Sequence, residues 1–475
     1  FSLVSFFGKV NYTYADRYLA SFTIRRDGSS RFGKNNKYGT FPSFSAGWRI
    51  SEEKWMSGLR DSWLSNLKLR ASWGQTGNQE ISNTARYTLY TSSYGEANFG
   101  GQSYGTSYDI QGTNGGNALD SGFKRNQLGN DNIKWETTTQ TNIGLDLGLF
   151  NNAIYGSLEW YYKKTKDILV YMPGIGVMGE GSSMWINAGE MLNKGFELNV
   201  GYRGGVADFS YDIAGNISTN RNEVTKIPET IAAAGTFGGS GVQSVVGHPM
   251  NSYVGYVFDG IFQNQDEVDN HAVQEGAGVG RMRFRDLNED GVITTLDQTW
   301  IYDPTPDFTW GLNIYLQYKN LDLTMFWQGV QGVDALTTVA PGGDTNGGYK
   351  VQTDLWAGVN VPFLNKGDRV LDAWSPTNTS STIPALSTYD NNNEKRFSSY
   401  YVENGSFLKL RTIQIGYNLP EAVVKKTPMS KIRLYLSAQN LLTIKSSSFT
   451  GVEPEKTLFG SPLPVNLTFG LNVTS

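Results

Sequence analysis

A strict alternation of apolar and polar residues recurs along this 475-residue chain and limits its fold more than any other feature. In "NIGLDLGLF" (142–150), Ile143, Leu145 and Leu147 alternate with polar residues and glycines. The segments "FELNVGYR" (196–203) and "WGLNIYLQYK" (310–319) follow the same pattern. A period of two places successive side chains on opposite faces of a β-strand. The sequence therefore predicts an all-β protein.

The length of the alternating segments indicates a membrane protein. Many of them reach the roughly 9–11 residues of a tilted membrane-spanning strand, whereas a typical soluble strand has about 5–6 residues. One face is apolar enough to contact lipid, and the other carries charged and amide groups suited to a water-filled interior. No apolar run approaches the ~20 residues that a membrane-spanning helix needs. The alternative is a soluble protein of two or three β-sandwiches, which also alternate but rarely combine long strands with very unequal loops.

Short connections alternate with long stretches rich in Gly, Asn, Ser and Thr. These long stretches lie near residues 76–132, 169–191, 221–307, 332–405 and 445–463. Thirteen spanning strands are expected, near residues 3–14, 18–28, 40–50, 66–75, 133–149, 153–168, 193–203, 208–220, 308–318, 321–331, 406–418, 431–444 and 464–474. Bacterial outer-membrane barrels have short periplasmic turns and long extracellular loops. We therefore predict an antiparallel transmembrane β-barrel in which residues 221–307 form a long extracellular loop region.

The parity of the strands and one change of phase give two further expectations. With the short turns in the periplasm, the first and last strands both run inward, and single-chain bacterial barrels have even strand numbers. Residues 1–475 are therefore expected to be the C-terminal part of a barrel, with the N-terminal strands outside this sequence.

In residues 406–419, Leu408 and Leu410 alternate in one phase while Ile413 and Ile415 alternate in the other. This slip predicts a β-bulge.

Composition excludes several functions. The formal net charge is −4, which gives no electrostatic case for nucleic-acid binding. There are no cysteines, so disulfides, thiolate nucleophiles and cysteine-based metal sites are absent. The two histidines, His248 and His271, have no evident catalytic partner and are expected to be structural. With no phosphate loop, nucleophile elbow or zinc signature, we do not expect an enzyme.

The stretch "RDLNEDGVITTLDQ" (285–298) has the spacing of an EF-hand calcium loop, with Asp instead of Glu at the twelfth position. Calcium takes six to eight oxygen ligands, and the glycine at position 291 permits the sharp bend that such a loop needs. The flanks show no helical period, so barrel strands are expected to clamp the ends of the loop. The expected calcium ligands are Asp286, Asn288, Asp290 and Asp297 through their side chains and Val292 through its carbonyl.

The alternative for residues 286–297 is a turn whose Asp and Asn side chains accept hydrogen bonds from their own backbone amides. A calcium ion here would have a structural role, crosslinking a long extracellular loop.

Two further groups of residues offer binding chemistry. The glycine-rich stretch 91–117 carries aromatic residues that can stack on sugar rings or pack the loop against itself or a partner: Tyr94, Phe99, Tyr104 and Tyr108. Several charged residues fall on the polar face of the expected strands: Lys68, Arg70, Asp146, Glu197 and Arg203. They can contact substrate, line water or bind a domain inside the barrel, so no substrate-binding residue is chosen.

Several segments resemble one family. Residues 14–56, 133–170 and 284–332 resemble segments of SusC/RagA-type TonB-linked outer-membrane proteins of Bacteroidota. The segments "DAWSPTNTSSTIPAL" (372–386), "FLKLRTIQIGYNLPE" (407–421) and "LYLSAQNLLTI" (434–444) follow in the family's order. The resemblance covers the whole chain but only the C-terminal half of a family member.

This resemblance implies an outer-membrane barrel of about 22 strands, plugged by an N-terminal domain. It also implies that TonB drives import of oligosaccharides or peptides and that a SusD-like lipoprotein forms the lid, often in dimers of barrel–lid pairs. The plug domain and about nine strands would lie outside residues 1–475. The alternative is a SusC-like barrel that serves as a non-transporting structural subunit of a larger outer-membrane complex.

Overall fold

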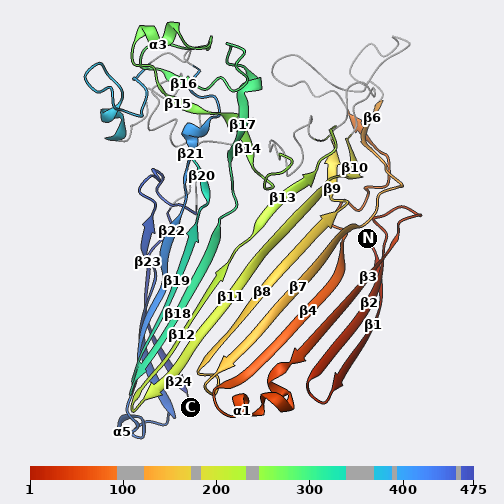
Figure 1. Ribbon diagram of the computed structural model, residues 1–475, viewed down its shortest axis with the longest axis vertical. Coiled ribbons are helices and arrows are strands. Elements are labelled where there is room, and N and C mark those ends of the chain that lie inside the picture. The colour runs from red at the N-terminus through yellow and green to blue at the C-terminus, as the bar shows by residue number, and fades with distance from the viewer. Residues whose placement is uncertain are drawn as a thin grey trace, which may run out of the picture.

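The computed structural model describes residues 1–93, 122–172, 183–229, 231, 245–337, 368–387, 393–455 and 462–474. Its main feature is an antiparallel sheet in which thirteen strands pair in chain order and a fourteenth, β13, pairs beside β11 (Figure 1). The thirteen are β1 (Leu3–Tyr14), β2 (Tyr18–Ser29), β3 (Tyr38–Arg49), β4 (Leu64–Asn78), β7 (Glu136–Leu149), β8 (Ile154–Lys166), β11 (Glu190–Val206), β12 (Phe209–Ser218), β18 (Phe308–Tyr318), β19 (Leu321–Gln331), β22 (Phe407–Asn418), β23 (Lys431–Lys445) and β24 (Asn466–Thr474).

These strands confirm the thirteen expected from the alternation, each with its ends within three residues of the prediction. Short connections gather at one end of the sheet, the turn end, and long ones at the other, the loop end (Figure 1). Among the described residues no helix is both long and apolar enough to cross a membrane.

Local backbone conformation explains the shortest turns. Ala15 and Asp16 join β1 to β2 with φ of 51° and 53°, and Asn151 and Asn152 join β7 to β8 with φ of 56° and 60°. Two successive residues with positive φ form the tight hairpin turn whose twist matches that of the strands. The two intermediate connections contain short helices instead, α1 (Ser57–Arg60) and α5 (Glu421–Val424), which the alternation gave no reason to expect.

Register keeps the apolar residues of neighbouring strands on one face. Ile143 lies opposite Trp160, and Leu145 lies opposite Leu158. The side chains of this face are largely exposed, as Leu158 at 46% and Phe469 at 73% illustrate. An exposed apolar surface that spans thirteen strands is far larger than soluble monomers tolerate. We call it the outer face, and the opposite, polar side of the sheet the inner face.

The predicted bulge is present in β22. Leu410 pairs with Trp327 and Thr412 with Phe326, so that Arg411 is the extra residue on the β22 side. The pairing with β23 is also irregular at this point, but there the extra residue is on β23, since Leu410 lies opposite Leu442 and Thr412 opposite Gln439. The extra residue returns Leu408 and Leu410 to the outer face together with Ile413 and Ile415.

The long connections contain structure that the sequence analysis did not predict. Additional strands at the loop end are β5 (Leu89–Ser93), β6 (Gly122–Leu128), β9 (Leu169–Met172), β10 (Ser183–Asn187), β13 (Arg221–Lys226), β14 (Tyr253–Tyr256), β15 (Phe258–Ile261), β16 (Met282–Phe284), β17 (Gln298–Tyr302), β20 (Asp334–Leu336) and β21 (Val402–Asn404). β14–β17, the helix α3 (Gln265–Asp269) and residues 393–401 surround a hydrophobic core, and we call them the outer unit. Its buried residues are Met282, Phe284, Ile293, Tyr400 and Tyr401.

Candidate functional site

The inner face carries a balanced group of four charges on β4, β7 and β8. The Arg70 Nε lies 3.1 Å from the Asp146 Oδ1, and the Lys68 Nζ lies 3.8 Å from the Asp146 Oδ2. Arg70 also forms an ion pair with Glu159 on β8. Arg70 can lie across β7 because its register partner is Gly144, where a Cβ would come within 2.6 Å of the guanidinium carbon. Two positive and two negative side chains therefore neutralise one another on the wall.

A bidentate ion pair spans β22. The Arg433 Nε and Nη2 on β23 lie 3.0 and 2.5 Å from the two carboxylate oxygens of Asp322 on β19. Asp322 is buried. Gly416 on β22 lies opposite Asp322 in register and leaves room for the Arg433 side chain, because a Cβ there would collide with the guanidinium.

A second ion network binds the segment after β23 to the wall. Lys409 on β22 is fully buried and pairs with both Glu453 and Glu455. Glu455 pairs in addition with Arg411, the bulge residue. Burial raises the pKa of Glu455, but hydrogen bonds from Arg411 and Lys409 outweigh it, and the net pKa is lowered. The network anchors this segment from inside.

Three of the five charged residues predicted on the polar face lie together, and the other two lie apart from them. Lys68, Arg70 and Asp146 meet in the group of four. Glu197 lies opposite Glu159 in the register of β11 and β8. Arg203 lies at the turn end, where its Nε donates to the Asn152 carbonyl at 3.1 Å.

Sequence reasoning missed Glu159 and the Lys409 network. Glu159 had a signal, because it follows Tyr155 and Ser157 at alternate positions of the polar face. Glu453 and Glu455 had none, because they lie 44 and 46 residues from Lys409 and outside any alternating segment.

The predicted calcium loop is compact, and its side chains accept hydrogen bonds from its own backbone. The Asp286 carboxylate accepts from the amides of Glu289 at 2.8 Å and Gly291 at 2.9 Å. The Asn288 Oδ1 accepts from the Asp290 amide at 3.1 Å, and the Asp290 Oδ1 from the Val292 amide at 2.9 Å. These bonds are those of the turn alternative. Gly291, with φ of 82°, provides the expected bend.

Asp297 closes the loop from a fully buried position. Its carboxylate accepts from the amides of Leu287 at 2.9 Å and Thr294 at 2.7 Å. Burial raises the pKa of Asp297, but the hydrogen bonds from Thr294, Leu287 and Asn288 outweigh it, so the net pKa is lowered. The short strands β16 and β17 lie close before and after the loop, but they pair with β15 and β14 and not with strands of the wall, so the loop is not clamped by barrel strands as expected.

The loop is also attached to the outer unit through backbone pairing. Val273 donates to the Gly291 carbonyl and accepts from the Ile293 amide. Successive carbonyls alternate in direction along an extended chain, so the Val292 carbonyl points away from Val273. Within the described parts of the chain, no group of three or more His, Cys, Asp and Glu side chains is arranged to hold a metal ion.

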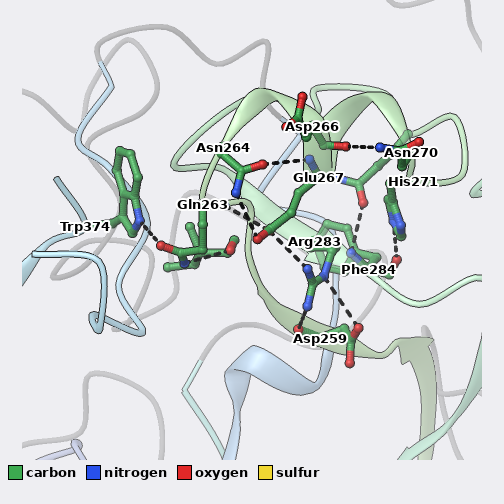
Figure 2. A network of polar contacts seen from close by, with 12 residues as sticks. Asp259, Gln263, Asn264, Asp266, Glu267, Asn270, His271, Arg283, Phe284 and Trp374 are labelled. Carbon is green, nitrogen blue, oxygen red and sulfur yellow. Dashed lines mark hydrogen bonds and ion pairs between the residues drawn. The ribbon is translucent and has the colours of Figure 1, made fainter. Parts of the chain in front are cut away.

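The outer unit is held together by polar contacts between segments distant in sequence (Figure 2). Glu267 on α3 accepts from the Gln263 amide at 3.0 Å and from the Arg283 Nη1 at 3.3 Å. Trp374, far along the chain, donates its indole N–H to the Gln263 Oε1 at 2.8 Å. The His271 Nε2 lies 2.9 Å from the Phe284 carbonyl.

Two ionisable groups near the base of the outer unit have raised pKa values. Burial raises the pKa of Tyr302 to about 12, with smaller contributions from Tyr253 and the carboxylates of Asp334 and Asp303. Burial also raises the pKa of Asp334, against the lowering effect of the Asp303 amide, which donates to it at 2.7 Å.

The remaining residues singled out in the sequence, His248 and four aromatic residues, contribute no described binding contact. His248 stacks on Trp300 with ring centres 4.3 Å apart. Tyr94, Phe99, Tyr104 and Tyr108 lie outside the described residues, so stacking on sugars stays a prediction.

Comparison with known proteins decides the family. The family profile described as "TonB dependent receptor-like, beta-barrel" matches residues 1–291. The chain belongs to the TonB-dependent receptor β-barrel family. TonB-dependent receptor P3 of Formosa agariphila is 36% identical over 462 residues, which cover 95% of this chain and 42% of that protein. TonB-dependent receptor SusC of Bacteroides thetaiotaomicron is 31% identical, covering 100% of this chain and 43% of SusC.

Solved structures agree with this assignment. The structure of the RagAB peptide transporter matches with a TM-score of 0.77 and 25% identity, over 99% of this chain and 47% of that one. The chain thus spans less than half the length of these relatives. The resemblance to SusC/RagA-type proteins is confirmed, and with it the location in the outer membrane. In this TonB-dependent receptor the outer face contacts lipid, the turn end faces the periplasm and the loop end faces the outside.

Proposed function

We propose that this chain forms the C-terminal wall and most of the extracellular surface of a receptor that imports a nutrient across the outer membrane. The observation that carries the proposal is the two-sided sheet, apolar outside and polar with paired charges inside. Such a wall encloses a water-filled path, as transmembrane barrels do. The family supplies the energy source, because its members are TonB-dependent receptors.

We further propose that a SusD-like lipoprotein covers the loop end as a lid. The hydrophobic core and long-range polar contacts of the outer unit give it the rigidity of a docking platform. Substrate, an oligosaccharide or a peptide, is caught between lid and barrel, and TonB then pulls on the plug domain to admit it. The complete receptor contains the plug and the TonB-binding segment in this proposal.

Uptake by living cells tests import. Cells that lack the gene are complemented with the complete receptor and given labelled oligosaccharides and peptides. Import predicts label inside complemented cells, and loss of that label when TonB is deleted in the same strain. Equal label with and without the receptor contradicts import.

The second candidate is a structural subunit of a larger outer-membrane assembly, which the same fold would also serve. Mass spectrometry of what co-purifies with the complete receptor in mild detergent separates the two. One lipoprotein in equal amount supports the importer, and a larger set of unrelated outer-membrane proteins supports the subunit.

We also propose that the loop 286–297 binds Ca²⁺ as a structural ion. The ligand set consists of Asp286, Asn288, Asp290 and Asp297 with the carbonyl of Val292. An oxygen that accepts one amide proton, such as the Asp290 Oδ1 or the Asp297 Oδ2, retains a second lone pair for a cation. The Val292 amide donates to the Asp290 Oδ1 at 2.9 Å, so these two residues lie together in the loop. The ion would supply positive charge between these oxygens and crosslink the loop.

Calorimetry on the complete, chelator-treated receptor tests this site. Calcium is titrated into the natural protein, into Asp290→Asn and into the control Asp269→Asn, which alters an exposed carboxylate of α3. The site predicts a binding heat that Asp290→Asn weakens and Asp269→Asn leaves unchanged. Calcium heat that is absent, or equal in all three proteins, contradicts it.

A further inference from the structure

A group of basic side chains lies on the outer face where β8, β11 and β13 approach the loop end (Figure 1). Residues directly opposite one another in an antiparallel pair lie on the same face of the sheet. Lys194 on β11 lies opposite both Tyr162 on β8 and Arg221 on β13. Lys194 also shares the lipid-facing phase of β11 with Phe196, two residues further along. We call the cations in this phase the basic group, which consists of Lys164, Lys166, Lys194, Arg221 and Lys226.

The basic group begins where the apolar band of the outer face ends. Along β8 the outer-face residues before Lys164 are Ile154, Gly156, Leu158, Trp160 and Tyr162. The rise from Ile154 to Lys164 is about 33 Å along the strand at ~3.3 Å per residue, or about 25 Å across the membrane at the usual strand tilt. The apolar band of a transmembrane barrel is about 25 Å tall. The basic group is therefore level with the headgroups of the outer leaflet.

The acidic side chains beside the basic group do not balance its charge. Glu190 lies between Lys166 and Lys226 in register, and its carboxylate lies 2.8 Å from the Lys164 Nζ. Glu223 on β13 adds a second carboxylate to this surface. The five cations of the group exceed these two carboxylates, so the surface has an excess of positive charge.

Lys194 and Arg221 show this excess most clearly. They lie directly opposite one another, and both are exposed. Like charges at directly opposite positions destabilise a sheet. Within the described ranges of the chain, neither side chain forms an ion pair. An anion from outside the chain, lying between the two cations, would relieve their repulsion.

The outer face of the later strands differs at the same level. At the loop end of β18, β19, β22 and β23 the outer-face side chains are neutral: Phe308, Gln331, Leu408 and Ile444. The positive charge is therefore specific to the surface of β8, β11 and β13. A local excess of charge favours a localised ligand over a general attraction to the membrane surface.

We propose that the basic group binds the phosphate groups of the glycolipid of the outer leaflet, lipopolysaccharide. Lysine and arginine form strong, charge-assisted hydrogen bonds with phosphate oxygens. The acyl chains of the same molecule would continue along the apolar band, past Trp160 and Phe196, so that one lipid contacts both parts of the surface. The inference concerns how the receptor is held in its membrane and does not depend on what the receptor imports.

Lipid binding by the complete receptor, purified in neutral detergent and freed of bound lipid, tests this site. The probes are lipid A, the phosphorylated membrane part of lipopolysaccharide, and the same lipid A after enzymatic removal of its phosphates. Native mass spectrometry measures how much of each is bound. The neutral variant is Lys194→Gln with Arg221→Gln. The matched control is Lys163→Gln with Lys9→Gln, which removes two cations from the inner face, one of them on β8.

Phosphorylated lipid A is expected to bind the natural receptor, and dephosphorylated lipid A to bind at least tenfold more weakly. Each cation near an anionic lipid surface contributes about fivefold in affinity. The neutral variant should therefore bind phosphorylated lipid A about tenfold to thirtyfold more weakly. The control should match the natural receptor, and so should Lys194→Arg with Arg221→Lys, which keeps both charges.

Equal binding of the two lipids by the natural receptor overturns the inference, whatever the variants do. Equal binding of phosphorylated lipid A by the natural receptor and the neutral variant also overturns it, as does an equal loss in the control. Loss of a co-purifying lipoprotein from the neutral variant, with lipid binding unchanged, would assign the basic group to a protein partner and overturn the lipid site. None of these outcomes bears on import.

Discussion

The wall and the outer unit of this receptor are stabilised in different ways. In the wall each strand pairs with its neighbour in the chain, and apolar residues lie on the lipid side at every second position. In the outer unit the contacts join residues far apart, as when Glu394 pairs with Arg281 across 113 residues. The wall therefore depends on a local pattern repeated thirteen times, and the outer unit on a few specific long-range contacts.

This difference predicts where single substitutions act. A polar residue on the inner wall meets water or a paired charge, so most changes there are tolerated. A change on the lipid side, or in a buried polar contact at the loop end, leaves a group without a suitable environment.

The largest loss is expected for Lys409→Met, at the junction of the two regions. Removing one partner of a buried ion pair costs about 3–5 kcal/mol, because the other charge stays buried without compensation. Glu453 is 5% exposed and would be that charge. We expect a lower thermal midpoint of the complete receptor and new protease cleavage within residues 446–455.

The matched control is Lys425→Met, which removes an exposed ion pair to Glu421 with side chains 76% and 86% exposed. Such a pair is worth about 0–1 kcal/mol. Equal effects of the two substitutions would show that the buried Lys409 network contributes no more stability than an exposed ion pair.

The next largest effect is expected for Leu145→Lys on the outer face of β7. A lysine that faces lipid near the midplane costs about 2–4 kcal/mol in a transmembrane barrel. Asn199→Lys on the inner face of β11 is the control, because its register partners Ser157 and Asn216 are polar and neutral. The thermal midpoint should fall for Leu145→Lys only, and a fall for Asn199→Lys alone would mean that the two faces are assigned the wrong way round.

The strands of the wall could be predicted from the sequence because their pattern is local. The period of two is visible within a single strand, and even the slip between Leu410 and Thr412 could be read as a bulge. The outer unit could not be predicted, because strands such as β15 and β16 are too short to show a period. Their pairing depends on partners such as Ser399, which accepts from the amide of Phe258 across 141 residues.

The loop 286–297 is an intermediate case, because its Asp and Asn side chains accept from amides of the same loop, as the turn alternative expects, while its calcium binding stays a prediction. Asp297→Asn is expected to destabilise this loop by about 1.5–3 kcal/mol, the usual contribution of hydrogen bonds to a charged group. An asparagine has one acceptor oxygen instead of two and turns an N–H₂ group toward backbone amides. Hydrogen exchange should accelerate in residues 285–298. The exposed control Asp269→Asn should leave that exchange unchanged, and equal exchange in both variants would contradict the role of Asp297.

The smallest effect is expected from pH. The pKa of Asp297 is lowered in the folded loop, so its contribution is present above the unfolded value near 3.8 and lost as pH falls through the folded value. Asp334 has a raised pKa, so its contribution to stability is not lost when the pH falls. Hydrogen exchange, corrected for its intrinsic pH dependence, should therefore accelerate below about pH 4 in residues 285–298 but not in β20. Acceleration in β20 at a higher pH than in residues 285–298 would contradict the pKa directions given for Asp297 and Asp334.

An accessibility scan along β11 tests most directly which face of the wall contacts lipid, and residues 1–475 contain no cysteine that would interfere with it. Each residue from Phe196 to Val200 is replaced singly by cysteine in the complete receptor, spin-labelled and measured in lipid vesicles against oxygen and a water-soluble nickel chelate. Strict alternation is expected, with oxygen favoured at Phe196, Leu198 and Val200 and the nickel chelate at Glu197 and Asn199. Equal access of the nickel chelate to every position would contradict a membrane-spanning wall.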